Sequence, residues 1–250
     1  MFASLKSEFR KLFSLRSTYI VFGFVLLAIA FFAFYVEGLK SSAVVLQQQP
    51  HWLNQEIIDA VTPTAVFLSL ASLLLITHEY RYNTIAYTLT SSNSRLRTLL
   101  AKILAISIYA LAATLVVATL APLAALLGAH VGHHAIVPQF MYYRETIPKV
   151  LFYGWGMAMA ALLLGALIRN QVGAIVTFFV VPGPVEALMG LLLKQNAKFL
   201  PFTALNQVLS RPETQGTNFL GIGRAAMVFG TYLAVGWIIA AILFLKRDAS

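Results

Sequence analysis

The sequence predicts an all-α integral membrane protein with six transmembrane helices. Of the 250 residues, 59% are hydrophobic and only 11% are charged, whereas a soluble domain carries about 25% charged residues because its surface faces water. Six apolar segments are each close to or above the roughly 20 residues that a helix needs to cross the bilayer core. Lys and Arg, which give the chain a net charge of +9, gather in alternate connections between these segments, as the positive-inside rule predicts.

Residues 1–17 are predicted to form an amphipathic helix that lies in the membrane interface. Apolar side chains recur there at helical spacing, and Lys6, Arg10 and Lys11 occupy the rest of the turn. An interfacial helix shows this pattern because its basic residues stay near anionic headgroups. The apolar face consists of Phe2, Leu5, Phe9, Leu12 and Phe13. An ordinary flanking anchor would show the same periodicity, so that reading remains open.

Residues 18–250 are predicted to form a single transmembrane domain. Lipid offers no partner for free backbone groups, so each span must be helical. The six expected spans are Thr18–Val36, Val61–Thr77, Leu99–Leu127, Val150–Ile168, Val172–Leu193 and Ala225–Leu245. Small residues in Gly154–Ala174 predict a face on which helix backbones approach closely. Six spans place both termini on the same side of the membrane.

The distribution of basic residues predicts the orientation. Eleven of the 18 Lys and Arg residues lie in the N-terminal segment, the second and fourth connections and the C-terminal tail, with only three acids among them. The denser side is expected to be cytoplasmic, so both termini face the cytoplasm. Topology accounts for most of the positive charge, and no nucleic-acid partner is expected.

The connection His78–Lys102 is too apolar for a plain linker. Its first half is rich in tyrosine, and its second half contains SSNSR, where Ser and Asn can cap a helix that continues as the third span. The pattern predicts a short helix, a turn and a new long helix. Exposed aromatic and charged side chains at a membrane face favour docking of a soluble partner. A short helix that packs on the membrane through its own tyrosines is the alternative.

Glu186 follows Pro182, Gly183 and Pro184, which are expected to break the fifth span. A carboxylate within the membrane usually faces a pathway, because burying its charge in lipid costs about 2.5–3.5 kcal/mol on insertion scales. The alternative is a structural role near water, in a re-entrant outer segment. Both remain open.

No metal site is expected. The chain has no cysteine, and the cluster His130, His133 and His134 lacks a fixed carboxylate to complete a ligand set.

The stretch EYRYNTIAYTLTSSNSRLRTLLAK resembles the signature of ABC type-2 permeases, the membrane subunits of one class of ABC exporter. In that family a Glu, an Arg and a Thr precede a Leu-Thr, a Ser-Arg and a Lys that opens the next span. The matching residues are Glu79, Arg81, Thr84, Leu89, Thr90, Ser94, Arg95 and Lys102. The family usually has Gly before the Thr, where this chain has Asn83; both tolerate positive φ.

Two further stretches resemble the same family. Ser7–Tyr19 is similar to its interfacial entry helix, and Lys198–Leu209 is similar to its re-entrant outer segment between the fifth and sixth spans. In the latter, Leu200, Pro201 and Phe202 match the Leu-Pro-Phe that precedes the re-entrant helix. The three stretches occur in the family's order and spacing along the whole chain.

The resemblance implies a permease subunit in a bacterial or archaeal cytoplasmic (inner) membrane. Two copies, or this chain and a related permease, would form the pathway, and each would dock on a separate ATP-binding cassette ATPase subunit that holds ATP and Mg. The entry helix and the loop after the second span would be the contacts, with Arg169 as a smaller one. This chain has no G-x-x-x-x-G-K-[ST] motif, so we expect no enzyme activity and no cofactor on it. A stand-alone ion-coupled carrier or channel is the alternative, although few charges lie within the spans.

Overall fold

The computed structural model describes residues 2–14, 16–40, 52–82, 95–134, 143–210 and 219–246, and within these ranges the chain is helical almost throughout and contains no strand. Five helices are long and apolar enough to cross a membrane. The predicted all-α class is therefore confirmed. The first expected span corresponds to the apolar helix Phe22–Val36, which is shorter than the other five. The total of six spans therefore stays a prediction.

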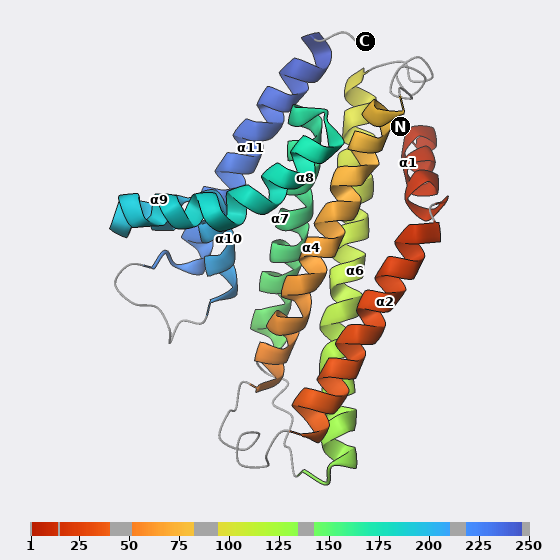
Figure 1. Ribbon diagram of the computed structural model, residues 1–250, viewed down its shortest axis with the longest axis vertical. Coiled ribbons are helices and arrows are strands. Elements are labelled where there is room, and N and C mark those ends of the chain that lie inside the picture. Colours follow the sequence, from red (N-terminus) through yellow and green to blue (C-terminus); the bar gives the residue numbers. More distant parts are fainter. Residues whose placement is uncertain are drawn as a thin grey trace. The chain divides into compact units, whose positions relative to one another are not determined.

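The chain divides into two compact units. Unit 1 consists of Met1–Ser14, Ser69–Ile108 and Gly156–Ser250, and unit 2 consists of Leu15–Leu68 and Tyr109–Trp155. The long helices α4 (Trp52–Arg81), α6 (Arg95–Val131) and α7 (Tyr143–Ile168) each contribute residues to both units. Figure 1 shows the course of the chain through these helices.

In unit 2, α2 (Arg16–Phe32) continues as the π-helical segment η1 (Ala33–Leu39) and packs against α6. The two helices meet at Gly38 and Gly128. A Cβ added at Gly38 would lie 2.8 Å from the Cα of Gly128, and one added at Gly128 would collide with the backbone carbonyl of Phe34. Only glycine allows backbones to approach this closely, so the pair fixes where the helices meet.

The predicted span Val61–Thr77 is too short at both ends, because α4 runs from Trp52 to Arg81. The added N-terminal turns carry buried Trp52, Leu53 and Ile57, so they have an apolar stripe of their own. A prediction based on uncharged runs misses such turns, because Glu56 and Asp59 interrupt the hydropathy without interrupting the stripe. In the same way, Glu79 and Arg81 lie on the last turn of α4 rather than in a separate short helix.

Helices α6 and α7 also extend beyond their predicted spans. Helix α6 begins at Arg95, directly after the SSNS sequence in which a cap was expected, and has 37 residues. Helix α7 begins at Tyr143, seven residues before the predicted start, with Glu145 in its first turn and Pro148 inside it. A carboxylate is favourable in a first turn because of the helix dipole, although its charge lowers the hydropathy of the segment.

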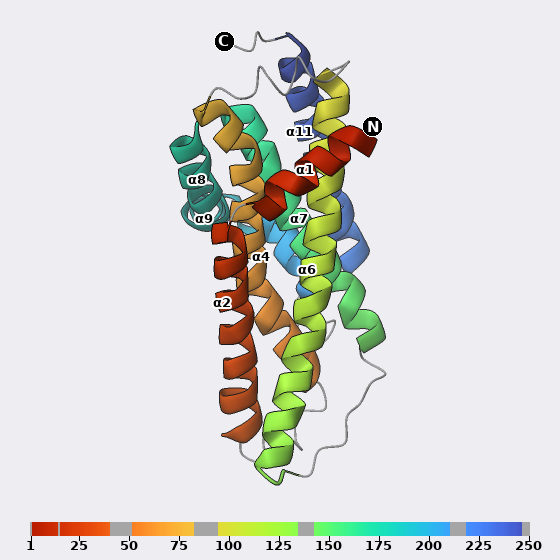
Figure 2. The same ribbon diagram turned by 90° about the vertical axis from the view of Figure 1, so that its right-hand side faces the viewer.

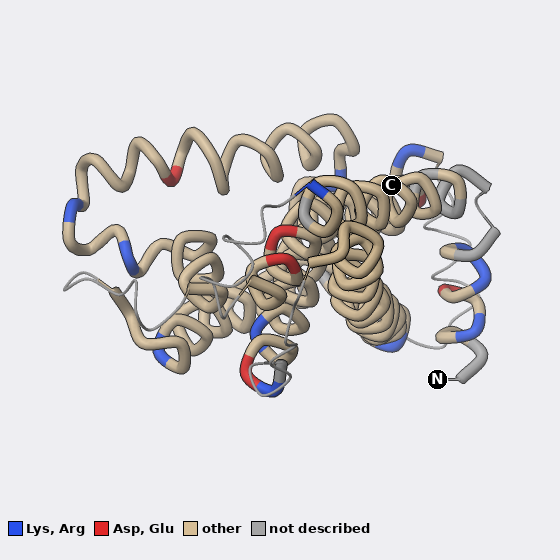
Figure 3. The backbone as a smooth tube through the Cα atoms, turned by 90° about the horizontal axis from the view of Figure 1, so that it is seen from below, with Lys and Arg blue, Asp and Glu red and all other residues tan. Residues whose placement is uncertain are grey.

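The helix break expected at Pro182–Pro184 is absent, and this prediction was wrong. Helix α8 (Gln171–Val180) passes through a π-helical turn, η3 (Val181–Val185), into α9 (Glu186–Leu193) and the 3₁₀ segment η4 (Lys194–Phe199). Proline lacks a backbone N–H, and a π-turn shifts the hydrogen-bond ladder so that the chain stays helical around the missing donors. The segment leads sideways from the end of α7 (Figure 1). Figure 3 shows that charged residues are sparse along it.

Unit 1 also contains α10 (Pro201–Leu209) and α11 (Ile222–Lys246), which pack against each other. Two glycines of α7 allow close contact with neighbouring side chains: a Cβ on Gly156 would lie 2.8 Å from the ring of Phe229 on α11, and one on Gly165 would lie 2.6 Å from Ile76 on α4. These contacts confirm the close-packed face predicted for Gly154–Ala174.

Helix α1 (Phe2–Ser14) also belongs to unit 1. It lies across the direction of α4 and α6 rather than along it (Figure 2). Leu12 is buried, whereas Lys6 and Arg10 are exposed. Helix α1 is thus amphipathic in the fold as well as in the sequence.

Candidate functional site

Four charged side chains from three helices meet in unit 1 and form what we call the ionic cluster. They are Glu8 and Lys11 of α1, Glu79 in the last turn of α4, and Lys102, two turns into α6. The Lys11 Nζ lies 2.8 Å from Glu8 Oε1 and 2.5 Å from Glu79 Oε1. The Lys102 Nζ lies 2.8 Å from Glu8 Oε2 and 2.7 Å from Glu79 Oε1. Each lysine therefore bridges both glutamates.

The ionic cluster is almost entirely removed from solvent. The side chain of Lys102 is 0% exposed and that of Glu8 is 2% exposed, whereas Lys11 closes the cluster from the outside at 34%. A single buried charge is strongly unfavourable, but two carboxylates and two ammonium groups neutralise one another at hydrogen-bond distance. The four side chains are stable inside the protein only as a set.

Local helix patterns explain why these charges are buried. On α6, Thr98, Lys102 and Ile106 recur every four residues and are all buried, so Lys102 lies in the middle of the stripe that faces the rest of unit 1. On α4, Glu79 continues a buried stripe formed by Ser72 and Ile76.

Lys11 is the member of the cluster that is partly exposed to solvent. Burial alone would lower the pKa of its ammonium, but hydrogen bonds to Glu79 and Glu8 and their negative charge outweigh this effect and raise the pKa above 10.5. Lys11 therefore stays charged at physiological pH. The second oxygen of Glu79, Oε2, is buried and accepts no hydrogen bond from any residue that the structure describes.

Next to the C-terminal turn of α4 lies a cavity of about 470 Å³, the arginine pocket, lined by Tyr80, Arg81, Arg169, Asn170, Gln171 and Val172. One guanidinium nitrogen of Arg81 donates a hydrogen bond of 3.1 Å to the side-chain oxygen of Gln171. The guanidinium of Arg169 lies 5.2 Å from the centre of the Tyr80 ring, and its buried Nε has no hydrogen-bond partner within the described ranges. Two guanidinium groups that line one cavity can bind a carboxylate or phosphate group.

Arg169 and Asn170 line this pocket in the turn that precedes α8. Arg169 has a φ of 56°, a left-handed conformation that is uncommon for a residue with a side chain. Asn170 caps α8, because its side-chain oxygen accepts a hydrogen bond of 2.9 Å from the backbone N–H of Gly173. The turn thus brings Arg169 to the side of α4 that carries Tyr80 and Arg81.

Glu186 has a specific set of partners in unit 1. Its Oε1 accepts a hydrogen bond of 2.8 Å from the backbone N–H of Phe202. Its Oε2 accepts bonds of 2.6 Å and 2.7 Å from the N–H and hydroxyl of Thr203. Helix α10 begins at Pro201 and Leu200 provides no side-chain cap, so Glu186 satisfies the free first-turn donors. This geometry favours the structural reading of Glu186 over a pathway carboxylate.

Several residues named from the sequence cannot be placed in a site. Thr84, Leu89 and Ser94 lie outside the described residues. Arg95 begins α6, and Phe2 and Phe13 belong to α1, but their side chains are not among those that the structure describes. Leu200 directly precedes α10, and Pro201 and Phe202 form its first turn. Glu79, Lys102 and Lys11 are brought together, although the sequence assigned Lys11 to a different element.

Glu8 is the member of the cluster that sequence reasoning missed. A signal was present: Glu8 precedes Lys11 by three residues and borders the apolar face near Leu5 and Leu12. A carboxylate at the edge of an apolar face indicates a buried partner rather than a solvated charge.

In comparisons with protein-family models and with curated proteins, nothing matched this chain. The interpretation of the site therefore depends on its own geometry. Among the residues that the structure describes, no group of three His, Asp or Glu could hold a metal ion. The chemistry available is that of charge pairing: the cluster fastens α1 to the ends of α4 and α6, and the arginine pocket beside it can receive an anion.

Proposed function

We propose that this chain is the permease subunit of an ATP-driven ABC transporter, an exporter whose translocation pathway forms from two permease subunits. Each permease docks on a separate ATP-binding cassette subunit through α1 and the connection between α4 and α6. In this proposal both termini face the cytoplasm, ATP and Mg are held by the partner, and this chain hydrolyses nothing itself.

The observation that carries the proposal is the ionic cluster. A permease must convert a push by a soluble motor into movement of its membrane helices. The cluster provides the required rigid link, because Glu8 and Lys11 on α1 are fastened to Glu79 on α4 and to Lys102 on α6. Separating α1 from either helix would leave buried charges without partners, and this costs several kcal/mol. A displacement of α1 is therefore passed to both helices.

The arginine pocket supports the same proposal from the partner's side. Arg81 and Arg169 line it at the connections that are expected to be cytoplasmic. A carboxylate on the surface of the ATPase would complete the pocket, because arginine binds carboxylates through two parallel hydrogen bonds. In this arrangement the partner engages α4 and the start of α8 next to the ionic cluster.

Copurification followed by reconstitution tests the proposal. The tagged chain is purified from membranes of the organism that carries it, and copurifying proteins with P-loop motifs are identified by mass spectrometry. We expect an ATP-binding cassette ATPase in stoichiometric amount, with nucleotide-dependent transport after reconstitution of the pair in liposomes. Cargo movement by the purified chain without nucleotide would contradict the proposal and favour a stand-alone ion-coupled carrier or channel.

Two variants distinguish docking from folding in this assay. Arg81→Gln removes an exposed charge from the arginine pocket, so the protein should insert normally while the complex hydrolyses ATP without transport or fails to assemble. Lys6→Gln removes an exposed charge on α1 that belongs to neither site, and it should leave both activities intact. Equal coupling in the two variants would remove the arginine pocket from the docking surface.

A further inference from the structure

The arginine pocket lies where three apolar helices end. Tyr80 and Arg81 lie in the last turn of α4, and Arg169 lies in the turn between α7 and α8. Helices α4 and α7, and α8 together with its continuation to Phe199, are each long and apolar enough to span a bilayer. The end of such a helix lies near the lipid headgroups, where tyrosine side chains are also common. The pocket is therefore at the level of the headgroups.

The two guanidinium groups of this pocket have no carboxylate partner among the residues that the structure describes. Arg81 donates its hydrogen bond of 3.1 Å to the neutral side chain of Gln171, and the guanidinium of Arg169 lies over the ring of Tyr80. The residues that line the pocket include no Asp or Glu. The nearby carboxylate of Glu79 belongs to the ionic cluster, in which two acids are balanced by two lysines. The pocket thus carries two positive charges that its own lining does not neutralise.

An apolar face of α8 begins inside the pocket. Val172 lines the pocket and is 71% exposed, and Val176 and Phe179 are also exposed. Because these residues are four and seven positions apart from Val172, they lie on one side of the helix. An acyl chain can lie along this face while the headgroup of the same lipid occupies the pocket.

A cationic pocket at headgroup level that continues into an apolar helix face fits one kind of ligand. We propose that the arginine pocket binds the phosphate of an anionic phospholipid whose acyl chains lie along Val172, Val176 and Phe179. Guanidinium groups bind phosphate oxygens through paired, charge-assisted hydrogen bonds, and basic pockets between transmembrane helices bind lipid headgroups. A zwitterionic lipid has the same phosphate, but the two arginines would repel its ammonium group.

A soluble phosphate ester fits the site less well. It would match the guanidinium groups but leave the apolar face of α8 unused. It would also reach the pocket at its bulk concentration, whereas a lipid is confined to the bilayer surface beside the pocket, and its effective concentration there is higher. The acyl chains add no selectivity among lipids, because all lipids have them. The selectivity between headgroups comes from the charge of the two arginines.

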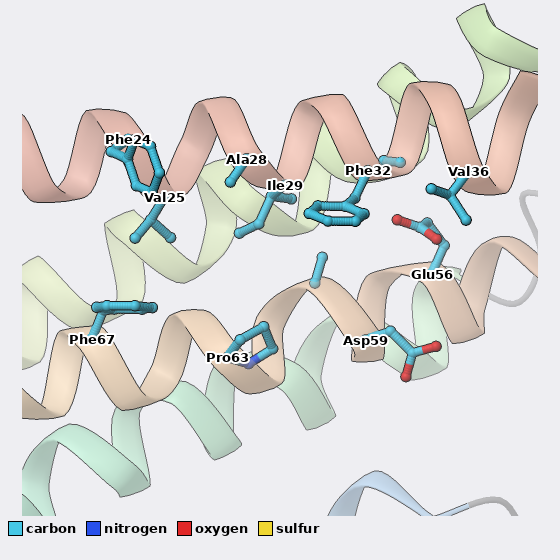
Figure 4. Close-up of a pocket in the computed structure, with 12 residues that line it drawn as sticks. Phe24, Val25, Ala28, Ile29, Phe32, Val36, Glu56, Asp59, Pro63 and Phe67 are labelled. Carbon is cyan, nitrogen blue, oxygen red and sulfur yellow. The ribbon is translucent and has the colours of Figure 1, made fainter.

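A groove in unit 2 provides a contrast. It has a volume of about 360 Å³ and is lined by residues of α2, η1 and α4, and Figure 4 shows its apolar walls. The charged residues in its lining are Glu56 and Asp59, and no Lys or Arg is among the described residues there. An acyl chain fits such walls, but no group in this lining would hold an anionic headgroup. We therefore expect headgroup selectivity at the arginine pocket and not at this groove.

Lipid binding does not depend on the proposed function, but one consequence does. The proposed function places a carboxylate of the ATPase in the same pocket, and two anions cannot share it. If that proposal holds, anionic lipid competes with docking and leaves the pocket as the ATPase binds. The two proposals can fail separately, because the experiment below uses the full chain without any ATPase.

Native mass spectrometry of the full-length chain in detergent tests the inference. The chain is titrated with dioleoyl phosphatidylglycerol, with dioleoyl phosphatidylcholine and with glycerophosphoglycerol, which is the anionic headgroup without acyl chains. We expect the first phosphatidylglycerol to bind about tenfold more tightly than phosphatidylcholine. Glycerophosphoglycerol at equal concentration should not displace it. Displacement would assign the pocket to soluble phosphate esters and overturn the lipid proposal.

Arginine variants locate the binding site. Arg169→Gln should weaken phosphatidylglycerol binding about tenfold, and Arg81→Gln/Arg169→Gln should weaken it further, toward the affinity for phosphatidylcholine. Arg10→Gln is the matched control, because it removes an exposed arginine of α1 in the same unit but outside the pocket. It should bind as the wild type does. Equal weakening in Arg10→Gln would show that binding follows net charge alone and would overturn the proposal.

Two further variants separate binding from folding. Arg169→Lys keeps the charge but loses the planar fork of donors, so its affinity should lie between those of the wild type and Arg169→Gln. Because Arg81 is exposed, Arg81→Gln serves alone if changes at Arg169 prevent folding. An unchanged preference for phosphatidylglycerol in Arg81→Gln would overturn the proposal.

Discussion

The ammonium of Lys102 lies 2.8 Å from the carboxylate of Glu8, a residue 94 positions earlier in the chain. Lys102 is fully buried, so this contact is not an incidental surface pair. It joins α1 to the N-terminal part of α6, a helix of 37 residues. Through the shared partner Glu79, the same contact extends to α4.

Lys102→Met should be the most destabilising change in the ionic cluster. It leaves two buried carboxylates with Lys11 as their sole remaining lysine in the cluster, and removing one partner from a buried pair costs about 3–5 kcal/mol. Thermal unfolding of the purified protein in detergent, followed by circular dichroism, measures the loss. Lys6→Met, at an exposed position of the same helix as Lys11, should change stability by less than about 0.5 kcal/mol.

The double variant Glu8→Gln/Lys102→Met tests whether charge balance is the cause. It restores neutrality with one glutamate and one lysine, so it should recover part of the stability lost in Lys102→Met. Additive losses in the two single variants would contradict a shared cluster, because only interacting residues give a coupling energy.

The charge of Lys11 should make the attachment of α1 sensitive to alkaline pH. Its pKa is raised above 10.5, so its contribution to stability is complete below pH 10.5 and is lost as the pH rises through the higher folded-state value. Tryptic release of the N-terminal segment should therefore be constant between pH 7 and 9.5 and increase at higher pH. In Lys11→Met the segment should be released more readily throughout, with a weaker rise; an equal alkaline rise would assign the transition to other lysines.

Glu186→Ala should destabilise α10 without preventing insertion. It removes three hydrogen bonds to the first turn of that helix, and loss of a charged cap costs about 1–3 kcal/mol. Thr203→Val removes the hydroxyl but keeps the backbone donor, so its effect should be smaller. Hydrogen exchange at the amides of Phe202 and Thr203 provides the direct measurement. Unchanged protection in Glu186→Ala would show that the carboxylate is not the cap.

Gly128→Ala should separate η1 from α6. Its added methyl group would meet the backbone of Phe34, which cannot rotate away as a side chain can, so we expect a loss of about 1–3 kcal/mol. Gly23→Ala is the same chemical change on α2 with nothing within 4 Å. It should be neutral or stabilising by up to about 1 kcal/mol, because alanine is the better helix former. Thermal stability of the two variants gives the comparison.

The sequence was sufficient to predict the all-α class, five of the long apolar helices and the approximate start of α6, because composition and length are strong signals for a membrane segment. It also singled out Glu79 and Lys102. It did not predict that they share partners, because a motif gives spacing along the chain and not the direction in which a third helix approaches. The sequence analysis therefore did not identify Glu8, which completes the cluster.

Hydropathy was least informative where polar residues lie inside a continuous helix. The turns before Val61 contain Glu56 and Asp59, and the fifth helix contains Pro182 and Pro184. In both places the chain stays helical: a buried stripe continues in the first, and a π-turn bypasses the missing donors in the second. Both features depend on the three-dimensional arrangement of the helix, and hydropathy averaged over a window of residues does not detect them.

The cap on α10 has a consequence for how the segment around it enters the membrane. Glu186 is translated 16 residues before Phe202, the first backbone donor that it binds. A chain truncated before Phe202 would lack the donors that Glu186 binds in the complete fold, so its carboxylate would be left without its cap partners. We expect the segment from α8 to α10 to be released into the bilayer as one unit, and truncation after Phe199 to trap it.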